Sequence, residues 1–218
     1  TIQGELGDQL VLADTAGTWT VNQNIYSVTG GPTLTVQGDL TVTLSPSAAN
    51  LSSLLGSVAD DSITGSSSAE SILGFAGNDT LAGGSGDDTL VGGAGDDTLV
   101  WDTQDSILDG GVGLDTLVIN DFYLDLTTPS EADSLSHFEV IDLQNFASNT
   151  LILDADVIAS MTGADNTLNV VGDITDRVYV ADWGQWSFLG EAQVNGEGAK
   201  AYRTTLTSGG VSQPVTLI

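Results

Sequence analysis

The chain has 218 residues, of which 30 are Asp or Glu and 3 are Lys or Arg, so its formal net charge is −27. A surface this acidic repels nucleic acid phosphates and anionic lipids, and the chain has no basic stripe, so nucleic acid is not an expected partner. Hydrophobic residues make up 40% of the chain, which predicts a packed core, and the absence of Cys excludes disulfides and Cys-bound metals.

The cations are confined to the end of the chain. Arg177, Lys200 and Arg203 are the only basic residues, so residues 1–176 have no side-chain cation to pair with their carboxylates. Either these acids form a solvated surface, or a positive partner from outside neutralises them. The first twenty residues lack a basic n-region and an apolar h-region, and no apolar run of 18 residues occurs, so neither a Sec-type signal peptide nor a membrane span is expected.

Residues 1–55 contain short runs of alternating β-branched residues separated by Gly or Asn turns, which predict an antiparallel β module. Ser45 is placed as a helix N-cap, Pro46 follows at the first helical position, and Gly56 stands just past the end. This pattern predicts a short helix that caps the segment which follows.

Residues 56–118 form seven consecutive nonapeptides without a break in register. The eighth position is apolar in every unit: Ile63, Ile72, Leu81, Leu90, Leu99, Leu108 and Leu117. The sixth position is acidic in all units but one: Asp61, Glu70, Asp79, Asp88, Asp97, Ser106 and Asp115. A stacked solenoid needs such an apolar row, with a Gly-rich turn and a short strand in each unit. Ca²⁺ prefers carboxylate and carbonyl oxygens, and each unit alone offers too few, so neighbouring units would share an ion.

The units GGSGDDTLV and GGAGDDTLV resemble the repeat G-G-x-G-x-D-x-U-x of RTX (repeats-in-toxin) proteins, a calcium-binding nonapeptide. The resemblance implies a parallel β-roll in which two units make one coil. Equivalent turns then recur every 18 residues, with Ca²⁺ between one unit and the next but one.

The resemblance assigns metal-binding roles to the acids and glycines that match the repeat. They are Asp61, Asp79, Asp88, Asp97, Asp115, Gly74, Gly77, Gly83, Gly84, Gly86, Gly92, Gly93, Gly95, Gly110, Gly111 and Gly113. We expect two or three ions on the edge that carries Asp61, Asp79, Asp97 and Asp115 (the first edge). On the other (second) edge, where Glu70, Asp88 and Ser106 align, we expect weak or absent sites, unless Asp105 substitutes for Ser106. The alternative is that the acids only form Asx-turns and a solvated rim.

Residues 119–218 alternate between apolar and polar residues in FEVIDL, TLIL, TLNVV and RVYV, which predicts further strands. Two short helices are expected, one after Pro129 and one across Ala155–Met161. The predicted fold class is therefore all-β, a parallel β-roll of nonapeptide repeats flanked by antiparallel β modules with a few short helices. FEVIDL, NTLILDADVIA and NTLNVVGDITDRVYV resemble the end of large RTX adhesins, which implies type I secretion and a secretion signal in or beside this region.

An enzymatic function is not expected. His137 is the only histidine, and the nucleophile-elbow, Walker and dinucleotide-binding motifs are absent. Trp19, Trp101, Trp183 and Trp186 serve either core packing or a sugar-binding face. A calcium-stabilised module that binds a glycan or peptide is therefore the alternative function.

The sequence thus predicts a monomeric, calcium-dependent folding and type I secretion module of an RTX adhesin. Its expected cofactor is Ca²⁺ in several copies, and its expected partners are the type I secretion apparatus and a surface ligand. Its expected location is extracellular or the bacterial cell surface, reached without an N-terminal signal peptide.

Overall fold

The computed structural model describes backbone and side chains for residues 53–120, 122–127, 134–143, 148–162, 167–172 and 176–181, and backbone alone for strands within residues 2–44 and 187–217. Two compact units are present, Thr1–Asp115 and Thr116–Ile218. The domain boundaries predicted after residues 55 and 118 stay predictions.

The first unit is built from strands of two to six residues. They are β1 (Ile2–Gln3), β2 (Gln9–Leu12), β3 (Trp19–Asn22), β4 (Ile25–Val28), β5 (Thr33–Gln37), β6 (Thr41–Leu44), β7 (Ser53–Leu55), β8 (Ser62–Thr64), β9 (Ser71–Ala76), β10 (Thr80–Ala82), β11 (Thr89–Ala94), β12 (Thr98–Trp101) and β13 (Ile107–Val112). Within this unit one sheet has the order β1-β4-β3-β5-β7-β9-β11-β13, and the other has the order β2-β6-β8-β10-β12.

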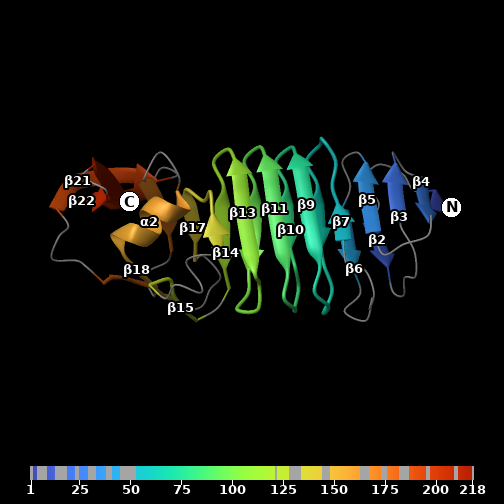
Figure 1. The fold of residues 1–218 in the computed structure, drawn as a ribbon, viewed down its shortest axis with the longest axis horizontal. Helices are drawn as coiled ribbons and strands as arrows, with labels where there is room; N and C mark the ends of the chain where they lie inside the picture. Colours follow the sequence, from blue (N-terminus) through green and yellow to red (C-terminus); the bar gives the residue numbers. More distant parts are fainter. Residues whose placement is uncertain are drawn as a thin grey trace. The chain divides into compact units, whose positions relative to one another are not determined.

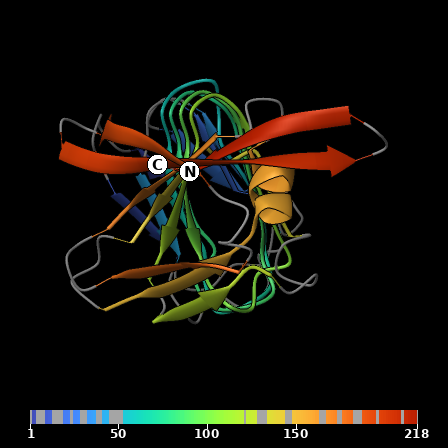
Figure 2. The same ribbon diagram turned by 90° about the vertical axis from the view of Figure 1, so that its left-hand side faces the viewer.

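The repeat forms a parallel roll, as predicted. Strand β9 pairs with β11 and β11 with β13, and β8 pairs with β10 and β10 with β12, all parallel and shifted by 18 residues. Each coil therefore gives one strand to each sheet. Figure 1 shows β9, β11 and β13 as successive arrows of one direction, and the turns of these coils overlap in the view of Figure 2.

The eighth position of each nonapeptide forms the core. All seven of these Leu and Ile side chains are at most 1% exposed. Because side chains alternate along a strand, the residues on either side of this position face outward. Each fully buried Leu or Ile contributes roughly 1.5–3 kcal/mol relative to an exposed one, so the apolar row is the main attraction between coils.

Parallel pairing continues in front of the repeat, where we had predicted an antiparallel module. Pairs β2–β6, β6–β8, β3–β5 and β5–β7 are all parallel, and only β1–β4 and β3–β4 are antiparallel. The prediction was wrong for most of these pairs, because alternation of apolar residues identifies a strand but does not determine the direction of its neighbour.

The predicted capping helix does not reach Gly56. Residues Ser53–Leu55 form β7, and Leu54 pairs with Ile72 in the apolar row and is fully buried. Burial of Leu54 between the sheets therefore overrides the local helix signal there. Ser45 and Pro46 lie outside the described residues.

The second unit contains β14 (Thr116–Ile119), β15 (Tyr123–Asp125), β16 (Leu135–Ser136), β17 (Val140–Asp142), β18 (Thr150–Leu153), α2 (Ala155–Met161), β19 (Thr167–Val171), β20 (Arg177–Val180), β21 (Ser187–Val194), β22 (Glu197–Ser208) and β23 (Val211–Leu217). Strands β14, β17 and β19 pair in parallel, and so do β15, β18 and β20. The strands predicted in this region are present. Among the described pairs of this region, β21–β22 and β22–β23 are antiparallel, so the predicted antiparallel module was wrong for β15 and for β17 to β20.

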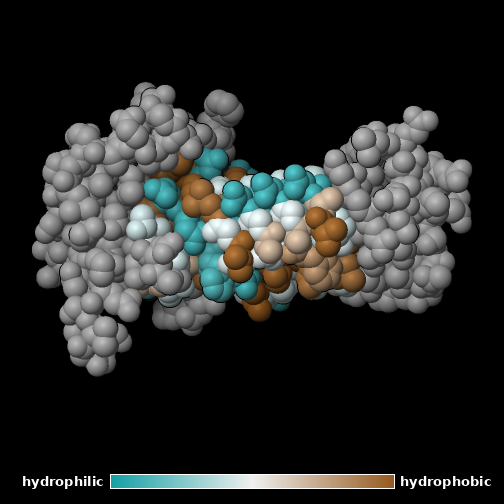
Figure 3. Space-filling model, turned by 90° about the horizontal axis from the view of Figure 1, so that it is seen from above, coloured by the Kyte–Doolittle hydropathy of each residue, from teal (hydrophilic) through white to brown (hydrophobic). Residues whose placement is uncertain are grey.

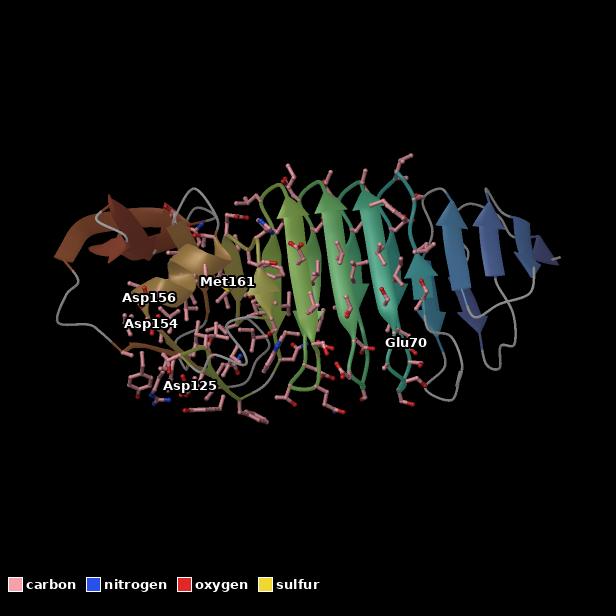
Figure 4. The ribbon with its side chains drawn as sticks, in the orientation of Figure 1. Glu70, Asp125, Asp154, Asp156 and Met161 are labelled. Atoms are coloured by element: carbon pink, nitrogen blue, oxygen red, sulfur yellow. The ribbon has the colours of Figure 1, made fainter. Side chains whose placement is uncertain are left out.

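Helix α2 confirms the helix predicted across Ala155–Met161. The Asp154 carboxylate accepts a 2.9 Å hydrogen bond from the Val157 N–H as the N-cap, and Ile158 and Met161 are buried. Asp154 and Asp156 lie at the start of the helix and Met161 at its end (Figure 4). The helix predicted after Pro129 falls outside the described residues. No helix in the described part of the chain is long and apolar enough to cross a membrane.

Replacing Phe75 by Gly should stabilise the roll by about 1 kcal/mol, because a left-handed non-Gly residue costs roughly 1–2 kcal/mol. Phe75 has φ +80° and stands where the next coil of the same edge has Gly93, at φ +118°. Thermal unfolding would show a rise in Tm of about 2–4 °C. Phe122→Gly is the control, because Phe122 is also exposed but is not among the described residues with positive φ, so its replacement should lower Tm. A similar fall in Tm for both variants would contradict the prediction.

Candidate metal centres in the repeat

The acids at the sixth position are buried to the same degree as the leucines of the core. Their exposed fractions are 3% for Asp61, 3% for Glu70, 1% for Asp79, 0% for Asp88, 1% for Asp97 and 0% for Asp115. A solvated rim therefore does not describe these acids. An unpaired carboxylate is costly to bury, so this row needs a compensating charge or proton.

On the first edge the buried acids form a ladder of hydrogen bonds. The backbone N–H of Asp61 donates to Asp79 Oδ1 at 2.8 Å, that of Asp79 to Asp97 Oδ1 at 2.7 Å, and that of Asp97 to Asp115 Oδ1 at 2.8 Å. The structure thus brings together the acids that the 18-residue spacing had paired. One carboxylate oxygen of Asp79, of Asp97 and of Asp115 is fixed by this ladder.

A second ladder runs along the same edge at the fifth position and faces solvent. The Asn78 N–H donates to Asp60 Oδ1 at 2.7 Å, the Asp96 N–H to Asn78 Oδ1 at 2.9 Å, and the Leu114 N–H to Asp96 Oδ1 at 2.9 Å. Beside it, the third position exposes apolar residues such as Val58 and Val112. Figure 3, which views this edge from above, shows hydrophilic side chains running beside hydrophobic ones.

The glycine at the first position leaves room for the second oxygen of the buried acid. A Cβ on Gly74 would collide with Asp79 Oδ2 and would lie 2.7 Å from the Gly92 carbonyl oxygen. A Cβ on Gly92 would likewise collide with Asp97 Oδ2 and would lie 2.6 Å from the Gly110 carbonyl oxygen. At each of these glycines a carboxylate oxygen and a carbonyl oxygen of the next coil therefore lie within 2.7 Å of the point where a Cβ would stand, and both are hydrogen-bond acceptors.

The second oxygens of Asp79, Asp88 and Asp97 are buried without a hydrogen-bond partner. Burial raises the pKa of Asp79 and of Asp97 to about 6, against the effect of the backbone N–H that each accepts from. Burial likewise raises the pKa of Glu70 and of Asp88. The folded chain therefore resists the ionisation of these groups unless a positive charge arrives.

These oxygens fit a hard divalent cation. Ca²⁺ coordinates carboxylate and carbonyl oxygens together. One oxygen of each kind lies beside Gly74, and one of each kind lies beside Gly92. When bound, Ca²⁺ would supply positive charge to these acceptors. No group of three or more His, Asp or Glu side chains within the described residues forms a metal cluster by itself. The residues that would hold the cation are therefore Asp79, Asp88 and Asp97, together with backbone carbonyls.

The other glycines with predicted metal roles shape the turns. At the second and fourth positions the described glycines have φ between +98° and +154°, which L side chains rarely adopt. They are Gly84, Gly93, Gly111, Gly77, Gly86, Gly95 and Gly113. A Cβ on Gly83 would collide with Asp88 Oδ2, as a Cβ on Gly92 would collide with Asp97 Oδ2.

The acids of the first repeat coil have hydrogen-bond donors that sequence reasoning missed. The Ser57 N–H and Oγ donate to Asp61 Oδ2 at 2.7 and 2.9 Å, and the Ser66 N–H donates to Glu70 Oε2 at 3.0 Å. Ser66 Oγ donates to Glu70 Oε1. The sequence feature that could have revealed these donors is a serine at the second position of the nonapeptide, where the motif has glycine. The sequence groups Asp61 with Asp79 and Asp97 as a predicted calcium ligand. Asp61 differs from them because its Oδ2 accepts hydrogen bonds from Ser57.

On the second edge, Asp105 lies at the end of the acidic row. Ser106 is exposed and its Oγ donates to the Asp87 carboxylate. Asp105 accepts a 2.9 Å hydrogen bond from the Asp102 N–H, and its Oδ1 is buried without a partner. Burial, followed by the charges of Asp102 and Asp88, raises the pKa of Asp105 to about 7. Asp105 is thus the acid nearest to the place predicted for Ser106.

Two further predicted residues are now placed. Trp101 is 4% exposed and belongs to the core, so it does not contribute to a sugar-binding face. His137 is exposed and has φ +56°. Trp183 and Trp186 lie outside the described residues, and only the backbone is described at Trp19.

The family model of the RTX calcium-binding nonapeptide repeat, in four copies, matches residues 73–100. Residues 73–100 are RTX calcium-binding repeats. No curated protein and no solved structure matches the chain. The RTX match contains Asp79, Asp88 and Asp97, the three sixth-position acids whose second oxygens face no donor, and it begins after the acids that Ser57 and Ser66 satisfy.

In chelator, the roll should be more stable at pH 4 than at pH 7.5. The pKa of Asp79 and of Asp97 is about 6 in the folded chain and has a model value of 3.8, so the folded state binds these protons more tightly. The stability that these bound protons contribute is fully present below the pKa of 3.8 that the two carboxyls have in the unfolded chain. It is lost as the pH rises through about 6, their pKa in the folded chain. Urea unfolding at a series of pH values measures this, and the double variant Asp79→Asn/Asp97→Asn should flatten the profile. Stability that rises with pH in chelator would contradict it.

Proposed function

We propose that the chain is a calcium-dependent folding module of a secreted RTX protein. The observation that carries this proposal is that a buried carboxylate oxygen without a hydrogen-bond partner and a carbonyl oxygen of the next coil both lie beside Gly74, and again beside Gly92. The RTX repeats at residues 73–100 imply calcium binding, and the buried acids explain why folding would depend on it.

The energetics support a switch between low and high calcium. Residues 1–176 contain no Lys or Arg, so no side-chain cation of the roll can neutralise the acidic row. Calcium sites of extracellular modules have dissociation constants on the order of 10⁻⁴ to 10⁻³ M. A ligand that binds only the folded state at a hundredfold excess over Kd adds about 2.7 kcal/mol per site, so several sites together suffice to drive folding.

An extracellular adhesin is the parent protein that we propose. The support is the resemblance of FEVIDL and the strands after it to the end of RTX adhesins, together with the secretion that is typical of RTX repeat proteins. A chain that stays unfolded at low calcium could pass through a type I secretion channel and fold outside. Attachment to a surface, a biofilm or another cell would then be the role of the parent protein.

Calcium titration of the purified chain, followed by far-UV circular dichroism from chelator to about ten millimolar, should show a cooperative gain of β signal. Asp97→Ala should move the midpoint to higher calcium by about tenfold or more, because Asp97 lies in two of the predicted sites. Asp96→Ala is the matched control, since Asp96 is the neighbouring acid but faces solvent, and its midpoint should change little. An unchanged midpoint in Asp97→Ala would refute the pairing of the sites.

Export of the full chain should depend on a type I secretion apparatus. The amount of chain in the medium is compared between cells with and without the apparatus. A variant that lacks residues 119–218 should remain inside the cells in both cases, because the proposed signal lies in or beside this region. Equal export with and without the apparatus would overturn this part of the proposal.

A further inference from the structure

The second unit repeats the geometry of the RTX turn without its motif. Residue Tyr123 pairs with Thr150, and Thr150 with Arg177, each 27 positions apart. The residues that stand directly before these strands are Phe122, Asn149 and Asp176. They occupy the place that the sixth-position acids hold in the roll, one residue before the strand.

Two backbone hydrogen bonds at this place recur in both units. The Arg177 N–H donates to the Asn149 carbonyl at 2.9 Å, as the Thr98 N–H donates to the Asp79 carbonyl at 2.8 Å. The Asn149 N–H donates to Asp176 Oδ1 at 2.9 Å, as the Asp79 N–H does to Asp97 Oδ1 at 2.7 Å. Asn149 therefore corresponds to Asp79 in its backbone contacts.

The first-position residues correspond as well. In the roll the Gly56 N–H donates to the Leu73 carbonyl, just before Gly74, at 2.7 Å. In the second unit the Leu143 N–H donates to the Val171 carbonyl, just before Gly172, at 2.8 Å. A Cβ on Gly172 would lie 2.8 Å from Asp176 Oδ2, which repeats the approach of acid and glycine in the roll.

The side chain at this place differs in two respects. Asn149 Oδ1 is buried without a hydrogen-bond partner, whereas Asp79 Oδ1 accepts the Asp61 N–H at 2.8 Å. Asn149 is 1% exposed, and its Nδ2 donates to the Leu143 carbonyl at 3.1 Å and to the Ile119 carbonyl at 3.4 Å. Because Val118 pairs with Asp142, these two carbonyls belong to equivalent residues of successive coils. Where the roll places a carboxylate oxygen against a first-position carbonyl, the second unit places an amide N–H₂ against two of them.

We propose that the Asn149 amide replaces the calcium ion of the RTX coils, so that the stacked strands β14 to β20 fold without calcium. This inference rests on the proposed calcium function of the roll. A neutral amide is buried without the cost of a charge, and its two N–H groups satisfy carbonyls that a cation would otherwise coordinate. Ser57 and Ser66 act by the same principle on the acids of the first repeat coil, where they donate to the oxygen that faces no donor at Asp79 and Asp97.

The calcium requirement is therefore confined to the Gly-rich coils, and the coils that follow them in the sequence are held by hydrogen bonds. The second unit then provides an ordered parallel strand edge in low calcium. The replacement of calcium depends on the side chain of residue 149. Changing that residue to an acid should therefore make the folding of strands β15, β18 and β20 depend on calcium.

Hydrogen–deuterium exchange of the full chain, read by mass spectrometry with and without calcium, tests this. In chelator the wild-type chain should protect the amides of residues 150–153 and should leave those of residues 80–100 unprotected. Protection of neither segment in chelator would overturn the inference and leave the calcium function intact. Protection of both segments in chelator would overturn the proposed calcium function itself.

Asn149→Asp is the decisive variant. In chelator the exchange rate of residues 150–153 should rise by about tenfold or more, since a buried carboxylate then faces two carbonyls, and calcium should restore the wild-type rate. Asn169→Asp is the matched control, because Asn169 lies half-buried in the same unit and its Nδ2 donates to the Glu139 carbonyl alone, at 3.2 Å. It should not create a response to calcium.

The remaining outcomes of Asn149→Asp count against the inference. An unchanged exchange rate in chelator would show that the amide hydrogen bonds do not hold the coil. Loss of protection that calcium does not restore would show that residue 149 is not equivalent to the acids of the roll. The reciprocal variant Asp97→Asn should increase protection of the roll in chelator and decrease it in calcium, and the opposite pattern would equally overturn the inference.

Discussion

The crowding of two acceptor oxygens beside the first-position glycine is the constraint on which the rest of the roll depends. Asp97 Oδ2 and the Gly110 carbonyl both lie where a Cβ on Gly92 would stand. Only glycine leaves this space. The acid is held there because its other oxygen accepts a backbone N–H and because the leucine two residues later is buried in the core.

One chain meets this constraint in several chemically different ways. Ser57 and Ser66 donate hydrogen bonds to the acids of the first repeat coil, while a raised pKa favours a proton on Asp79 and Asp97. A cation would satisfy the same oxygens from outside the chain. In the second unit an asparagine amide takes the place of the acid and its partner together. Hydrogen bond, proton and cation are therefore alternatives at equivalent positions.

The acids of the repeat lie in two rows with different consequences. The exposed row of the fifth position, including Asp60 and Asp96, is hydrated and accepts backbone N–H groups from the next coil. The buried row of the sixth position opposes folding when it is ionised. Burial of the leucines stabilises the stacking of the coils. Whether the folded roll is stable then depends on neutralisation of the buried acids.

The nonapeptide register by itself determined the apolar row and the acidic row, because a strict period places equivalent residues at equivalent heights in every coil. The resemblance to the RTX repeat added the roll of two units per coil, and with it the acids that align on the first edge. Tertiary structure decided what no local pattern contains: the parallel pairing of β2 with β6, of β3 with β5 and of β5 with β7, the strand at Ser53–Leu55, and the wide coils after Asp115. It also decided that Ser57 and Asn149 face acceptor oxygens. These outcomes depend on contacts between residues many positions apart, whereas a sequence pattern records only which side chains share a face.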